Sequence, residues 1–249
     1  MNRFAKLGAP LVAACALLTG WPALAAKDKG KSSAKAASPK APPNAAPDYD
    51  FGCDLSKVKL TAWTPKGLLL SAADAAPFQL VKAHVTAAQV PGLKRTLCKD
   101  LSEAKYWLPG KGKGGVSWAD LVVTTKDIQI HRAFSKGAFT CSQAKPAEEL
   151  GGWWALHPLT MPKKTYRKSV AVCESWNDFS MKVTCTVKKG TVIAIGPSEQ
   201  ANCSLASGCS KMPAGWPTRY DATNDHQVFI NRYSPGFAKY LHCSAPAAW

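Results

Sequence analysis

The chain has 249 residues and a formal net charge of +16, and 46% of its residues are hydrophobic. After the first 25 residues no window is apolar enough to cross a membrane, which excludes a transmembrane helix from the mature protein. The positive charge favours anionic partners, because a strongly basic domain attracts them over long distances.

The N-terminal residues have the three parts of a secretory signal peptide. Two basic residues precede an apolar stretch over 7–18, and the small-residue segment Ala23–Ala25 follows it. We therefore expect residues 1–25 to be removed and the protein to be exported, either to the periplasm or to the extracellular space. A second interpretation is a lipoprotein anchored through Cys15, because residues 12–15 resemble a lipoprotein cleavage box.

Residues 26–48 consist almost wholly of Lys, Ala, Ser, Pro, Gly and Asn. Such a segment has little apolar surface to bury, so we expect a disordered linker. Seven of the 32 basic residues and two of the 16 acidic residues lie before Tyr49, which leaves a formal charge of +11 on the rest of the chain. The basic excess therefore belongs to the part that folds.

Eight cysteines remain after the signal peptide: Cys53, Cys98, Cys141, Cys173, Cys185, Cys203, Cys209 and Cys243. An even number in an exported chain indicates a disulfide framework. No Cys-x-x-Cys pair is present and no Cys/His group has zinc-ligand spacing, so we expect no metal site and no cofactor. Spacing alone suggests two local bonds, Cys173–Cys185 and Cys203–Cys209.

Two segments of the chain resemble each other. Residues 127–141 and 226–243 both contain an alternating apolar strand, an Arg, an aromatic residue, a Ser-x-Gly turn and a final Cys, and another Cys precedes each at a similar distance. The pattern indicates either a chance match or a duplicated β-module. Duplication predicts the bonds Cys98–Cys141 and Cys203–Cys243.

Strand patterns dominate the folded part. Alternating apolar residues predict strands over 58–63 and 78–85, and residues 179–187 and 191–195 flank a Lys-Lys-Gly turn that predicts a β-hairpin. An apolar stripe over 93–104 predicts a helix behind Pro-Gly.

The predicted fold is mainly β, with α+β as an alternative, and it is stabilised by disulfides. We expect one or two short helices, and the 18 Gly and 18 Pro residues divide the rest into short elements. The break near residues 145–152 suggests two β-rich modules, residues 49–148 and residues 149–249.

Two clusters combine basic and aromatic residues. A Gly/Lys loop lies between Trp107 and Trp118 but lacks the order of a Walker phosphate loop, so we expect a mobile basic hairpin tip. Residues 162–168 follow Trp153 and Trp154, and cations among aromatics suit a nucleic acid or an acidic sugar, although a solvated strand beside core tryptophans is the alternative. The candidate binding residues are Lys111, Lys113, Lys163, Lys164, Tyr166, Arg167 and Lys168.

The segment Tyr220–Phe229 suggests catalysis. Its Thr-Asn-Asp-His-Gln-Val-Phe run resembles the Thr-x-Asp-His-x-x-x-Phe strand of barnase-like microbial ribonucleases. The resemblance implies that His226 is the general acid and that an upstream glutamate, here Glu199, is the general base. Phe229 stands one position earlier than in that family, and Arg219 is the only arginine between Glu199 and His226.

Three functions are compatible with these features. The first is an exported basic protein that binds an anionic polymer or surface, namely nucleic acid, acidic polysaccharide or anionic lipid. The second is a secreted, metal-independent, ribonuclease-like hydrolase that uses His226 and Glu199. The third is a toxin-like effector or an inhibitor of one, for which the sequence offers no specific residues.

Overall fold

The computed structural model describes residues 50–249 except 138–140, 142–149, 206–208, 233–236 and 238–240. The predicted signal peptide and linker lie outside the described residues. The strands are β1 (Thr61–Ala62), β2 (Phe78–Val85), β3 (Ala119–Thr124), β4 (Ile128–Phe134), β5 (Trp153–Trp154), β6 (Met181–Val187), β7 (Val192–Pro197), β8 (Ala201–Asn202), β9 (Arg219–Tyr220), β10 (His226–Phe229), β11 (His242–Cys243) and β12 (Ala247–Ala248). The helices are α1 (Ala72–Ala75), α2 (Val90–Thr96), α3 (Ala104–Trp107) and α4 (Lys163–Ser169), with 3₁₀ turns η1 (Leu55–Lys57), η2 (Ala87–Gln89) and η3 (Leu101–Glu103).

The predicted fold class is confirmed, because the described residues are mostly β with a few short helices and four disulfides. Six strands form a sheet in the order β1-β2-β3-β7-β10-β5, and every neighbouring pair is antiparallel. In a second sheet β6 pairs with β4 along one edge and with β11 and β12 along the other. β8 and β9 form a separate two-stranded ribbon.

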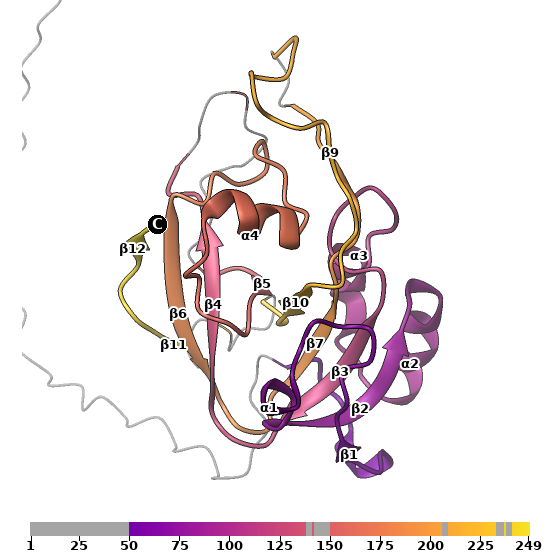
Figure 1. Ribbon diagram of the computed structural model, residues 1–249. Helices are drawn as coiled ribbons and strands as arrows, with labels where there is room; N and C mark the ends of the chain where they lie inside the picture. Colours follow the sequence, from indigo (N-terminus) through magenta and orange to yellow (C-terminus); the bar gives the residue numbers. More distant parts are fainter. Residues whose placement is uncertain (1–49, 138–140, 142–149, 206–208, 233–236, 238–240) are drawn as a thin grey trace, which may run out of the picture. The chain divides into compact units, whose positions relative to one another are not determined.

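The core has two parts, one on each face of the six-stranded sheet. Alternate residues of β3 and β7 point to opposite faces, as successive strand residues must. Val122 and Ile193 pack toward the second sheet, whereas Leu121 and Ala194 pack toward α3 and its neighbours, beside the fully buried Trp107. Figure 1 shows β4 and β6 on one side of this sheet and α2 and α3 on the other.

The predicted hairpin over residues 179–195 is wrong. β6 and β7 are consecutive in the chain, but β6 pairs with β4 and β7 pairs with β3 and β10. The two strands differ in burial, since β6 alternates while all six residues of β7 are buried. A strand that is covered on both faces belongs at the centre of a sheet, so the chain crosses between sheets at residues 188–191.

The other predicted elements agree with the structure to different degrees. β2 has the predicted bounds, whereas the strand predicted over 58–63 is only the two residues of β1. The predicted helix over 93–104 is divided among α2, η3 and α3. The basic segment 162–168, for which a solvated strand was the alternative, forms the helix α4.

The predicted disulfide pairings are also wrong. The bonds are Cys53–Cys98, Cys141–Cys209, Cys173–Cys203 and Cys185–Cys243. They join segments that sheet pairing brings together: Cys185 and Cys243, for example, stand opposite each other in β6 and β11. Neither bond expected from duplication is present, and the similar segments supply strands of different sheets, β4 and β10.

Candidate functional site

The basic segment that the sequence singled out is placed on α4. Arg167 and Lys168 come three and four residues after Lys164, so the three side chains share one side of the helix. Tyr166 faces the opposite side. Lys164 and Lys168 are exposed, and Lys163 at the first helical residue is half-buried. Tyr166 and Arg167 are buried. The five predicted binding residues on α4 are therefore two surface lysines, one half-buried lysine and two interior side chains.

A cleft of about 670 Å³ runs along the basic side of α4. We call it the α4 groove, and its lining residues are Lys164, Arg167, Lys168, Glu174, Gly215, Trp216, Pro217, Arg219, Tyr220, Asp221 and Thr223. Its second wall comes from β9 and the segment before it, about fifty residues later in the chain. Trp216 and Arg219 could not be identified as groove residues from the sequence, because no local pattern shows that residues 215–223 fold against α4.

The ion pairs of the groove leave its two lysines as the available charges. Arg167 Nε lies 3.5 Å from Glu174 Oε1, and its guanidinium stacks 4.4 Å from the centre of the Phe179 ring. Arg219 Nη2 pairs with Asp221 Oδ1 at 2.9 Å. Within the described part of the chain, neither lysine of the groove makes an ion pair. An anion in the groove would therefore meet two uncompensated ammonium groups.

Arg167 anchors the helix from inside. Its Nη1 donates to the Val172 carbonyl at 3.0 Å, and Glu174 Oε1 also accepts a hydrogen bond of 2.7 Å from the Tyr220 hydroxyl. This chain of contacts joins α4 to β9. Arg167 thus holds the two walls of the groove together.

The Gly/Lys loop lies beside residues 198–202. Gly114 donates to Gln200, and Asn202 and Glu199 donate to Gly112 and Gly115, so the two segments run side by side instead of forming an isolated hairpin tip. Gly112 and Gly114 have positive φ, and a side chain at Gly114 would meet the Trp176 ring. Lys111 and Lys113 are exposed, and neither lines the α4 groove.

Comparisons with protein-family models, curated proteins and solved structures found no match. Among the residues that the structure describes, no helix is long and apolar enough to cross a bilayer. No group of three or more Cys, His, Asp or Glu side chains in the same part of the chain is arranged to hold a metal ion.

His226, the predicted general acid, lies in β10 and is buried. Its Nε2 accepts a hydrogen bond of 3.3 Å from the Leu156 amide, and the His157 ring packs edge-on at 5.1 Å between centroids. Burial, with the nearby His157 adding to it, lowers the pKa of His226 to about 4. An imidazole with this pKa is neutral at pH 7 and holds no extra proton for a leaving group.

Glu199 lies just beyond the end of β7, whose Pro197 is paired with His226. Its Oε1 accepts a hydrogen bond of 2.8 Å from the Gln200 amide. The charged groups that act on His226 are His157 and Asp74, and Asp74 Oδ1 lies 2.9 Å from His157 Nε2. Catalysis by His226 and Glu199 stays a prediction, whose assay is RNA cleavage that His226→Ala abolishes.

Proposed function

We propose that this is an exported protein that binds a chain-like polyanion in the α4 groove. The observation that carries the proposal is the pair of uncompensated lysines, Lys164 and Lys168, on one wall of a cleft with Arg219 and Trp216 on the other. Paired cations attract phosphates or carboxylates, and an aromatic wall provides a flat surface for a base or a sugar. A cleft admits a polymer strand more readily than the flat surface of a membrane.

The whole-chain charge supports the same proposal. The residues from Tyr49 onward have an excess of eleven positive charges, which raises the rate of encounter with any polyanion. The four disulfides fit an exported protein, because such bonds persist in oxidising compartments. The groove adds a specific place where a bound strand would rest.

The test compares two double variants of equal charge. Lys164→Ala/Lys168→Ala removes the groove lysines, and Lys94→Ala/Arg95→Ala removes two exposed cations from α2. Binding to single-stranded RNA, polygalacturonate and anionic phosphatidylglycerol vesicles is measured by fluorescence anisotropy or co-sedimentation over a series of salt concentrations. We expect the groove variant to bind about tenfold more weakly. We also expect the magnitude of its slope of log K against log salt to be smaller by about 1 to 2, because a complex with fewer phosphate contacts releases fewer counterions when it forms.

The α2 variant is expected to keep the wild-type slope within about 0.5, because its cations lie outside the groove. Equal losses in the two variants would show that only total charge matters and would contradict the proposal. Binding to vesicles without binding to RNA or polygalacturonate would contradict the proposed polymer and would indicate that the partner is a lipid surface. A stronger interaction with RNA or with polygalacturonate identifies the class of polymer.

A further inference from the structure

A second cavity, of about 230 Å³, lies on the opposite side of α4. We call it the tryptophan cavity, because Trp153, Trp154 and Trp176 contribute to its wall. Tyr166 of α4 and Phe179 add two more aromatic rings, which pack 5.4 Å apart. Its volume suits one six-membered ring, since pockets for larger ligands exceed about 300 Å³.

Two largely buried polar side chains, Gln227 and Tyr166, line this cavity. Gln227 of β10 is 5% exposed, and its Nε2 donates to Gly115 O, Val170 O and Ser198 Oγ at 3.0–3.2 Å. These three bonds fix the amide group and leave its Oε1 as an acceptor. Tyr166 is 8% exposed, and its hydroxyl can donate or accept a hydrogen bond.

Polar side chains that line a cavity take hydrogen bonds from water or from a ligand, so Gln227 Oε1 and the Tyr166 hydroxyl are the polar groups that a bound ligand would meet. Gln227 Oε1 requires a donor, and the Tyr166 hydroxyl takes either role. Hydroxyl groups on a saturated ring match both atoms, and the apolar faces of such a ring stack on indoles. A plain aromatic acid has no donor for Gln227.

The two charged side chains among the described lining residues of the cavity are both basic. Arg132 of β4 lies along its wall, 6.0 Å from the centre of the Trp154 ring, and the exposed Lys113 stands at its rim. No Asp or Glu is among the described lining residues. The field in the cavity therefore favours a ring with a negative substituent.

We propose that the tryptophan cavity binds a single pyranose ring with a carboxylate, that is, a uronic acid or one uronic acid unit of a polysaccharide. The ring stacks on the indoles, its hydroxyls bond with Gln227 Oε1 and the Tyr166 hydroxyl, and its carboxylate lies toward Lys113 at the rim. This proposal does not rest on polymer binding in the α4 groove, because the two sites have no lining residue in common; they meet where Arg167 of the groove stacks on Phe179 of the cavity.

The experiment titrates the mature, disulfide-bonded protein with D-glucuronate, D-glucose and benzoate. Binding is followed by tryptophan fluorescence and by saturation-transfer NMR. We expect saturable binding of glucuronate with Kd on the order of 1 mM, and binding of glucose and benzoate at least about tenfold weaker.

Four variants locate the site. Tyr166→Phe removes one hydroxyl and is expected to weaken glucuronate binding about fivefold, the equivalent of one hydrogen bond. Val172→Phe places a ring in the cavity and is expected to abolish binding. Lys113→Ala is expected to weaken binding two- to threefold, and Lys126→Ala, which removes an exposed lysine away from the cavity, is expected to have no effect.

Unchanged binding in both Tyr166→Phe and Val172→Phe would overturn the proposal, as would the absence of saturable binding up to 50 mM, which is about 50 times the expected Kd. Equal affinity for benzoate would overturn the sugar as the ligand. The groove variant Lys164→Ala/Lys168→Ala is expected to bind glucuronate as the wild type does. Failure of the polymer experiment and failure of this one are thereby distinguished.

Discussion

His226 is a buried imidazole at a junction of the fold. Its Nε2 accepts the Leu156 amide hydrogen, so the neutral ring keeps its proton on Nδ1, which is enclosed and has no partner among the described residues. Protonation would turn Nε2 into a donor that faces the Leu156 donor. The position therefore favours a neutral histidine, whatever other role the residue has.

This arrangement predicts a loss of stability in acid. Because burial lowers the pKa of His226 from 6.5 to about 4, the folded state binds fewer protons than the unfolded chain between these values, and the free energy of unfolding falls as pH is lowered. Between pH 7 and pH 5 the loss from this group is about 2 kcal/mol. Urea denaturation at the two pH values, for wild type and for His226→Gln, measures it as a difference.

The comparison of variants is needed because Asp50 acts in the opposite direction. Burial raises its pKa to about 6, so its folded state binds more protons than the unfolded chain between 3.8 and 6 and gains stability as pH falls. Asp50 contributes equally to both proteins. An equal pH dependence in wild type and His226→Gln would show that His226 is not the titrating group.

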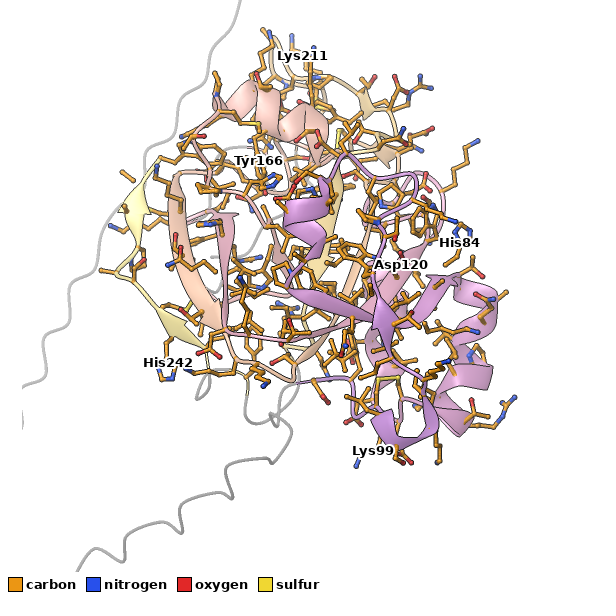
Figure 2. The ribbon with its side chains drawn as sticks, turned by 60° about the horizontal axis from the view of Figure 1, so that its bottom comes forward. His84, Lys99, Asp120, Tyr166, Lys211 and His242 are labelled. Carbon is orange, nitrogen blue, oxygen red and sulfur yellow. A yellow bond between two sulfur atoms is a disulfide. The ribbon has the colours of Figure 1, made fainter. Side chains whose placement is uncertain are left out.

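At the scale of elements, the pairing of β2 with β3 contains a bulge that a buried carboxylate closes. The register shifts between Leu80 and Val85, and His84 has a φ of 48°. Asp120 of β3 accepts the His84 amide at 2.7 Å and the Trp63 indole N–H at 2.8 Å. Figure 2 shows His84 and Asp120 near each other, whereas Lys211 and His242 lie at the edge of the molecule.

We expect Asp120→Asn to lower the free energy of unfolding by about 2 kcal/mol. The asparagine keeps one acceptor oxygen but replaces the other by an NH2 group, so either the Trp63 indole N–H or the His84 amide loses its acceptor. Asp221→Asn is the matched control, since its carboxylate is exposed and pairs only with Arg219 among the described residues; we expect a change below about 0.5 kcal/mol. Chemical denaturation of both variants measures the difference. Equal effects would contradict a role for Asp120 in closing the bulge.

Local sequence patterns correctly predicted only features that short stretches of the chain determine. β2 alternates and ends where predicted, and the basic residues of α4 were identified although their helix was not. The hairpin failed because β6 and β7 find partners far away in the chain, and a turn sequence does not report such partners. For the same reason the sequence showed Lys164 and Lys168 but not Arg219, which reaches the groove only through tertiary packing.

At the scale of the whole molecule, the two predicted modules share one sheet. β2 and β3 come from residues 49–148, and β7, β10 and β5 come from residues 149–249. We therefore expect one cooperative thermal transition in calorimetry of the oxidised protein, with equal calorimetric and van't Hoff enthalpies. Two resolved transitions would indicate that the ranges unfold separately.

The disulfide pairs provide a second test at this scale. Peptide mapping of the non-reduced protein by mass spectrometry is expected to give Cys53–Cys98, Cys141–Cys209, Cys173–Cys203 and Cys185–Cys243. Cys173–Cys203 joins the segment after α4 to the residue that follows β8, the partner strand of β9, so its loss is expected to loosen the α4 groove. Recovery of Cys98–Cys141 instead would restore the duplication hypothesis.

The position of β10 has a consequence for the newly made chain. β10 is the last of the six strands in the chain, yet it lies inside the sheet between β7 and β5. During synthesis, β5 leaves the ribosome about 70 residues and β7 about 30 residues before β10, so this part of the sheet closes only after β10 has emerged. Until then β5 and β7 lack the strand that joins them, so the growing chain cannot complete this sheet.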